Sequence, residues 1–349
     1  MSELSEKRIL EMTARFLPTV DIAGVQVERI TKGGSDRQYW RLITPDESII
    51  FMAYTDLRAD NLSFAPATEF LSAQGVAVPP ILAHDDAGRY LWSEDAGATD
   101  IWDFRNEPWE VRGPLYKATL QEAAKIHRIS EHAVPDELKA QLQRGFDADL
   151  YQWEQDYFFN RFAVKFSSLE LPELDAIHSS SVFKNLAQEL SDLPRFLVHR
   201  DFQSQNVIVK QSSPASASVC LIDYQGVRPG LPEYDLASLL LDPYVDMSDG
   251  EREELLQYYR DFRADDPEWN WDAKLYAKCA AQRLMQALGA YGYLGEVLGK
   301  REFLKHIPVA TARLRDTISR ANILPDLVAV LNLNPLDPLN PAGNAPTEG

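Results

Sequence analysis

Residues 198–209 read VHRDFQSQNVIV and place a polar turn between two apolar runs. The run FLV at 196–198 leads into the turn, and the run VIV at 207–209 follows it. Charged side chains are seldom kept beside buried segments unless they are paired or used. We therefore expect the polar residues of this turn, His199, Arg200 and Asp201 among them, to serve chemistry and not packing.

The spacing of this turn predicts a phosphoryl-transfer site. Such transfer needs a carboxylate that orients and deprotonates the attacking hydroxyl, and oxygen ligands for Mg²⁺. In kinase-type sites the carboxylate is the Asp of H-R-D-x-x-x-x-N, and the Asn five residues later holds metal. Asp201 and Asn206 match this spacing, and Asp223 ends the next apolar run, where a second metal ligand belongs. Three matches in register make a chance surface turn an unattractive explanation.

The nucleotide end of such a site is expected in the first ninety residues. KGGSDRQYWRL at 32–42 lies between two strand-like runs, with Gly33, Gly34 and Ser35 at the turn. A glycine-rich hairpin can bring backbone N–H groups to phosphates. A Gly-Gly hairpin also serves simple chain reversal, so this signal is weak alone.

Hydrophobic periodicity divides the chain into a β-rich part and a helical part. The first part is predicted to hold a leading amphipathic helix, strands at 25–31, 37–44, 48–54, 79–85 and 89–95, and a helix at 66–75. The second part is predicted to be helical at 115–129, 149–166, 235–241, 251–262 and 277–291, with short strands around the polar turn. No internal repeat is visible.

These segments resemble the aminoglycoside phosphotransferase and choline kinase family, whose members share the protein-kinase-like bilobal fold. The likeness rests on GGSDRQYWRL, ATEFLSAQGVAVPPIL, YLWSEDAG, VHRDFQSQNVIV, LIDYQG and YDLASLL. It implies an α+β fold with a small β-rich N-lobe built around one main helix and a larger, mostly α-helical C-lobe. The expected ranges are 1–93 for the N-lobe, 94–98 for the hinge, 99–333 for the C-lobe and 334–349 for a disordered tail.

The resemblance also implies roles for single residues, with ATP and Mg²⁺ as the nucleotide and metal. Asp201 would be the catalytic base, and Asn206 and Asp223 the Mg²⁺ ligands. Glu94 and its neighbours would place backbone groups against the purine, although a solvated linker residue fits Glu94 as well. Asp235 would brace the catalytic loop, and a helix N-cap for LASLLL is compatible with that role.

One departure from the kinase pattern concerns a strand lysine that contacts phosphates and pairs with a helix glutamate, here Glu69. Met52 stands about where this lysine belongs. Either another cation such as Lys32 or Arg37 reaches the phosphates, or nucleotide binding is weak or lost. The missing lysine also opens a non-enzymatic alternative, a pseudokinase that binds nucleotide or sugar and regulates a partner. The presence of all three reactive groups, Asp201, Asn206 and Asp223, argues against it.

The acceptor is suggested by two later segments. Residues 222–246 and 282–314 resemble bacterial kinases that phosphorylate the anomeric hydroxyl of N-acetylmuramate and N-acetylglucosamine. This implies a cytoplasmic amino sugar kinase that serves cell-wall recycling. Glu154 and Arg283 are candidate sugar-binding residues, although an ordinary amphipathic helix with core aromatics and solvated charges is the better explanation of the segment around Glu154. An aminoglycoside, choline or homoserine-type kinase is the rival, and the acidic segment 94–104 would then hold a cation.

Composition excludes several partners. A net charge of -18 argues against sequence-independent binding to nucleic acid or to an anionic membrane surface. No apolar run is long enough to span a bilayer, and the amphipathic N-terminus does not resemble a signal peptide. Cys220 and Cys279 lie in apolar contexts and are expected as buried free thiols. ATP or GTP as donor, the exact sugar and the oligomeric state are left open.

Overall fold

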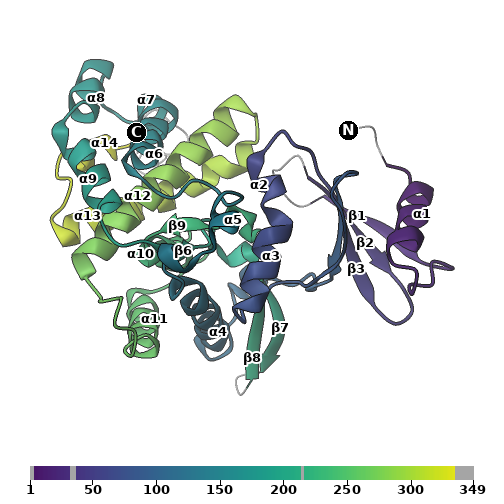
Figure 1. The fold of residues 1–349 in the computed structure, drawn as a ribbon. Helices are drawn as coiled ribbons and strands as arrows, with labels where there is room; N and C mark the ends of the chain where they lie inside the picture. The colour runs from purple at the N-terminus through teal and green to yellow at the C-terminus, as the bar shows by residue number, and fades with distance from the viewer. Residues whose placement is uncertain (1–3, 32–36, 214–215, 335–349) are drawn as a thin grey trace. The chain divides into compact units, whose positions relative to one another are not determined.

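The computed structural model describes residues 4–31, 37–213 and 216–334. The chain forms two compact units, residues 1–143 with 205–227 and residues 144–204 with 228–349 (Figure 1). The polar turn is shared between them, because Asp201 belongs to the second unit and Asn206 to the first. The predicted lobe and hinge boundaries remain predictions. The two compact units divide the chain at other residues.

The first unit is built on a five-stranded antiparallel sheet with the order β1-β2-β3-β5-β4. Successive side chains of a strand point to opposite faces, so Phe51 packs with Trp92 on one face and Met52 with Leu91 on the other. Ile9 and Met12 of the first helix cover the Phe51 face. The strands are β1 (Gln26–Ile30), β2 (Gln38–Ile43), β3 (Ser48–Ala53), β4 (Ile81–Asp85) and β5 (Tyr90–Glu94).

The helices of this unit and a second hairpin complete it. α4 packs against the hairpin of β7 and β8. The predicted helix at 115–129 starts earlier, at Trp109, because Pro108 supplies an extended residue before the first turn. The elements are α1 (Glu6–Phe16), α2 (Ala59–Leu62), α3 (Phe64–Ala73), α4 (Trp109–His127), α5 (Asp136–Lys139), β7 (Val207–Ser213), β8 (Ser216–Leu221) and the 3-10 turns Ile101–Phe104, Glu131–Ala133 and Tyr224–Gly226.

The second unit is mainly helical, as predicted, and contains one short antiparallel pair of strands. A further 3-10 turn, Ser204–Asn206, crosses from this unit into the first. The elements are α6 (Ala148–Phe158), α7 (Val164–Phe166), α8 (Leu171–His178), α9 (Ser181–Ser191), β6 (Phe196–Val198), β9 (Arg228–Gly230), α10 (Pro232–Leu240), α11 (Asp249–Phe262), α12 (Ala273–Gly292), α13 (Ile307–Ala321), α14 (Leu327–Val330), the π-helical turns Phe159–Ala163 and Tyr293–Val297 and the 3-10 turn Arg301–His306.

The helix predicted at 149–166 is interrupted by a π-helical turn where α12 approaches it. A Cβ atom at Gly292 would lie 2.1 Å from the carbonyl oxygen of Arg161, so only glycine permits this contact. The interruption therefore reflects close packing between two helices, which local periodicity does not encode.

Three smaller expectations can be compared with the structure. Cys220 and Cys279 are free and buried, as predicted. Within the described ranges, no helix combines the length and the apolar character needed to cross a membrane. Residues 335–349, nearly all of the predicted tail, lie outside the described residues.

Candidate active site

The start of the catalytic loop is held by the buried carboxylate of Asp235. This group accepts hydrogen bonds from the backbone N–H groups of His199, at 2.6 Å, and Arg200, at 2.8 Å. Arg200 has a φ of 77°, a backbone conformation that is unfavourable for residues other than glycine. Such a conformation persists only where the surrounding structure fixes it. The predicted brace is confirmed. The N-cap alternative is wrong, because α10 begins at Pro232 and Asp235 lies inside its first turn.

A second buried aspartate holds the other end of the loop. Asp242 accepts from the backbone N–H of Ser204 at 3.0 Å and from its hydroxyl at 2.6 Å. The backbone N–H of Tyr244 donates to the other carboxylate oxygen. Sequence reasoning missed Asp242, although its place seven residues after Asp235 at the end of an apolar run was a signal. The loop is thus fixed at both ends.

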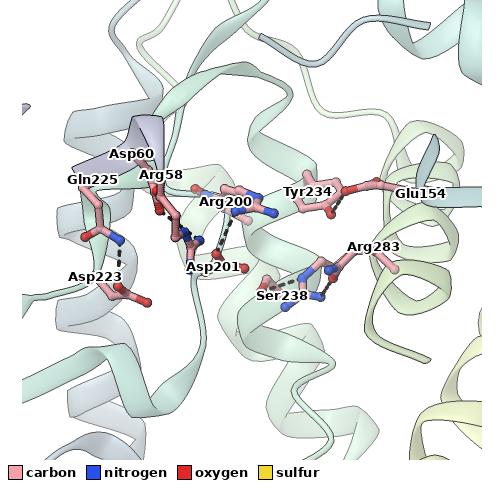
Figure 2. A network of polar contacts seen from close by, with 12 residues as sticks. Arg58, Asp60, Glu154, Arg200, Asp201, Asp223, Gln225, Tyr234, Ser238 and Arg283 are labelled. Atoms are coloured by element: carbon pink, nitrogen blue, oxygen red, sulfur yellow. Dashed lines mark hydrogen bonds and ion pairs between the residues drawn. The ribbon is translucent and has the colours of Figure 1, made fainter. Parts of the chain in front are cut away.

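Asp201 lies between these fixed ends, with 37% of its side chain exposed. Arg200 Nη1 is 3.3 Å from Asp201 Oδ2 (Figure 2). Burial alone would raise the pKa of Asp201, but the positive charges of Arg200, Arg283, His199 and Arg228 hold that pKa below its ordinary value. Asp201 is therefore ionised at neutral pH and can accept a proton or a hydrogen bond.

The two candidate sugar-binding residues belong to the surroundings of Asp201. Glu154 is 1% exposed and accepts from the Tyr234 hydroxyl at 2.9 Å and from Gln282 Nε2 at 3.0 Å. Burial raises the pKa of Glu154. Arg283 donates from Nε to the Ser238 hydroxyl at 3.0 Å. The structure thus brings polar groups of α6, α10 and α12 together, as Figure 2 shows.

Arg228 joins this group from β9, where it pairs in register with Val198 of β6. Burial, and then the like charge of Arg200, lower the pKa of Arg228 to about 10. Sequence reasoning missed this residue, since a single arginine in a short strand belongs to no motif. Its effect on Asp201 depends on the β6–β9 pairing.

The two predicted metal ligands lie at one end of the β7–β8 hairpin in the first unit. The backbone N–H of Ile222 donates to the carbonyl oxygen of Asn206 at 3.0 Å, which continues the pairing of Val207 with Leu221. Asp223 follows directly, in a left-handed conformation with a φ of 60° and with 40% of its side chain exposed. The hairpin register therefore places Asn206 opposite Ile222, the residue before Asp223.

A cation of the sheet reaches Asp223. Arg37 Nη2 lies 3.1 Å from Asp223 Oδ1, and the Arg37 side chain is 4% exposed. Gln225 Nε2 donates to the same oxygen at 2.8 Å. Met52 is 1% exposed in an apolar cluster, so position 52 serves packing. Of the two cations suggested by the sequence, Arg37 is the one found here, and Lys32 lies outside the described residues.

The donor set of Asn206 and Asp223 fits Mg²⁺. One amide and one carboxylate offer the hard oxygen ligands that Mg²⁺ prefers, and this ion commonly completes its shell with water and phosphate oxygens. Among the described residues no group of three or more His, Cys, Asp or Glu side chains could hold a metal by itself.

The predicted hinge borders a small pocket in the first unit. The pocket has a volume of about 150 Å³ and is lined by Pro80, Glu94, Ala96, Val219 and Cys220, among others. Asp95, between two of these residues, is tied to β2 and β3. Its carboxylate accepts from Arg41 Nε at 2.5 Å and from the Ser48 hydroxyl at 2.7 Å. The pocket wall is therefore anchored to the sheet.

Two further features of the predicted nucleotide site are Glu69 and the glycine-rich turn at 33–35. Glu69 is exposed on α3 and takes part in none of the ion pairs found within the described ranges. Gly33, Gly34 and Ser35 lie outside the described residues. With Met52 in place of a lysine, Glu69 has lost the partner that the kinase pattern would give it.

Known proteins give a consistent likeness. A protein named N-acetylmuramate/N-acetylglucosamine kinase from Caulobacter vibrioides is 25% identical over 332 residues, covering 84% of this chain and 88% of that protein. A protein of the same name from Neisseria meningitidis serogroup B is 25% identical over 313 residues, covering 84% and 86%.

Solved structures agree on the fold. A choline kinase from Streptococcus pneumoniae has a TM-score of 0.58 at 15% identity, covering 91% of this chain and 98% of that one. An ADP-bound aminoglycoside phosphotransferase has a TM-score of 0.60 at 13% identity, covering 92% and 100%. These likenesses confirm the predicted fold class.

The family itself follows from a direct match. The model of the phosphotransferase enzyme family matches residues 26–273, which include the catalytic loop, both hairpin residues and Asp235. The predicted enzyme class, a phosphotransferase with a hydroxyl group as acceptor, is confirmed with it. This chain belongs to the phosphotransferase enzyme family.

Proposed function

We propose that this protein transfers the γ-phosphoryl group of ATP to the anomeric hydroxyl of an amino sugar of the N-acetylmuramate or N-acetylglucosamine type. The names of the relatives support this acceptor, and the matches span most of both chains. The structural observation that carries the chemistry is Asp201, partly exposed, ionised and held in a loop that is braced at both ends.

In the proposed reaction, Asp201 orients the sugar hydroxyl and accepts its proton. The hydroxyl oxygen attacks the γ-phosphorus, the bond from that phosphorus to the β,γ-bridging oxygen breaks, and ADP leaves with the electron pair. Arg200, 3.3 Å from the carboxylate, keeps Asp201 charged until the proton arrives. The braces from Asp235 and Asp242 hold the base in place without a cost at the moment of reaction.

We assign the nucleotide and the metal to residues of the first unit. The pocket at Glu94 and Ala96 offers apolar walls and linker backbone to a flat purine. Asn206 and Asp223 would hold Mg²⁺, which neutralises charge on the phosphates. Arg37, beside Asp223, is the candidate for the phosphate contact that Met52 cannot make.

A cationic acceptor, as an aminoglycoside or choline kinase would take, is less well supported. The acidic segment 94–104 was its candidate site. Asp95 is paired with Arg41, while Asp100 is 3% exposed and forms a capping box with Asp103. These carboxylates therefore serve the structure of the first unit. A pseudokinase is disfavoured because the base, the amide ligand and the carboxylate ligand are all present.

The test is a mass-spectrometric screen for Mg²⁺- and ATP-dependent phosphorylation of N-acetylmuramate, N-acetylglucosamine, choline, homoserine and an aminoglycoside. Asp201→Asn is the control. We expect a sugar phosphate from the wild type alone. A product from choline, homoserine or the aminoglycoside and from neither sugar would replace the acceptor class. Nucleotide binding without any product would support the pseudokinase.

A further inference from the structure

Arg283 of α12 is a buried cation that forms no ion pair with the described carboxylates. The residue is 5% exposed, and it takes part in none of the ion pairs within 4.0 Å found in the described part of the chain. Removing a charge from water without a paired and hydrogen-bonded counter-charge is costly. We therefore expect the buried guanidinium of Arg283 to have a role other than stabilising the fold.

The guanidinium of Arg283 is oriented by two neutral partners. Nε donates to the Ser238 hydroxyl of α10 at 3.0 Å, and Nη1 donates to Gln286 Oε1 on the next turn of α12. Nη2 makes none of the hydrogen bonds found among the described residues. Figure 2 shows the Arg283 side chain in the same network as Asp201 and Ser238. The fork is therefore held in position with one nitrogen available to a ligand.

The two carboxylates near the Arg283 guanidinium, those of Asp201 and Glu154, have other partners. Three arginines, Arg200, Arg228 and Arg283, act on Asp201 together. Asp201 already pairs with Arg200, and both oxygens of Glu154 accept from the neutral donors Tyr234 and Gln282. Neither carboxylate therefore forms an ion pair with Arg283, and this guanidinium is the group of the cluster suited to an anionic part of the acceptor.

We propose that Arg283 binds a carboxylate of the acceptor and so makes this enzyme prefer an acidic amino sugar to its neutral counterpart. The inference rests on the proposed function and extends it. N-acetylmuramate carries a lactyl carboxylate that N-acetylglucosamine lacks, and a guanidinium nitrogen forms charge-assisted hydrogen bonds with a carboxylate. The γ-phosphate of ATP also offers anionic oxygens to Arg283. Comparing N-acetylmuramate with N-acetylglucosamine distinguishes the two ligands, because only the first sugar carries the carboxylate.

The experiment measures kcat and KM for both sugars with the wild type, Arg283→Gln and Arg283→Lys. We expect Arg283→Gln to raise KM for N-acetylmuramate about 10- to 100-fold more than it raises KM for N-acetylglucosamine. Arg283→Lys should fall between. Arg301→Gln, which removes an exposed arginine of the same unit, should change neither. An equal loss of kcat for both sugars would assign Arg283 to the phosphate or to the fold and overturn the inference.

A second measurement does not depend on the folding of a variant. Calorimetry of the wild type without nucleotide should show N-acetylmuramate binding at least about 10-fold more tightly than its methyl ester. Equal binding of acid and ester would overturn the inference alone, because the proposed function survives if both are phosphorylated. No binding of the acid, together with no sugar product, would overturn both.

Discussion

Asp201 and Asp223 are held in position in two different ways. In the second unit, Asp235 and Asp242 fix the loop of the base through backbone hydrogen bonds. In the first unit, Asp223 occupies a left-handed conformation, and the side chains of Arg37 and Gln225 bond its carboxylate. Asp201 is held by buried groups that no ligand replaces, whereas the carboxylate of Asp223 is balanced by the cation of Arg37. We infer that the base is preorganised and that the metal side is completed by its ligands.

The largest expected effect comes from removing the base. Asp201→Asn keeps the size of the side chain and loses the carboxylate, so kcat should fall about 100- to 10,000-fold. Because the base belongs to the braced region, nucleotide affinity measured by calorimetry should change little. Activity within a factor of a few of the wild type would mean that Asp201 is not the base.

Weakening a brace comes next. Asp235→Asn leaves one oxygen for two backbone donors and should lower the free energy of unfolding by about 2–3 kcal/mol. Denaturant titration measures this loss. Asp235→Asn should also lower kcat, because it misplaces Asp201. A loss of global stability alone would not lower kcat under conditions in which the protein stays folded. Unchanged stability and unchanged kcat would remove the preorganised half of the comparison.

Replacing Arg37 tests the metal side. Arg37→Met removes the cation 3.1 Å from Asp223 and should raise KM for ATP about 10-fold, while KM for the sugar stays nearly constant. Arg37→Lys, which keeps the charge, is the control and should lie closer to the wild type. If Arg37→Met leaves the KM for ATP unchanged, the lysine missing at Met52 is replaced by another residue.

The smallest effect concerns pH. The neighbouring arginines hold the pKa of Asp201 below its ordinary value, and protonation of Asp201 removes the base. Activity should therefore be lost only as pH falls below the ordinary aspartate range, near about 4. Arg200→Gln should move this acid limb of kcat/KM upward by about one pH unit. A limb at the same pH in both proteins would mean that Arg200 does not set the pKa.

Local sequence carried much of the fold and the motif residues. Alternating apolar residues predicted all five strands of the sheet, because the period of a half-buried strand is local. The spacing of Asp201, Asn206 and Asp223 was equally visible, and so was the bracing role of Asp235. These predictions required only neighbours within one or two elements.

The rest depends on contacts between residues distant along the chain. Arg228 acts on Asp201 because β9 pairs with β6, and Ser238 orients Arg283 because α10 packs on α12. Gln282 binds Glu154 across more than a hundred residues. The sequence signal was a pair of polar residues, Gln282 and Arg283, between the apolar runs CAA and LM of this helix. Such a signal predicts a buried polar group and leaves its partner undetermined.

The central claim is tested most directly by locating the phosphoryl group in the product. Phosphorus and proton nuclear magnetic resonance of a reaction with N-acetylmuramate, ATP and Mg²⁺ should show one new phosphate ester coupled to the anomeric proton. The same reaction with Asp201→Asn should show none over the same time. Phosphate on another hydroxyl, or the same product from Asp201→Asn at a comparable rate, would contradict the account.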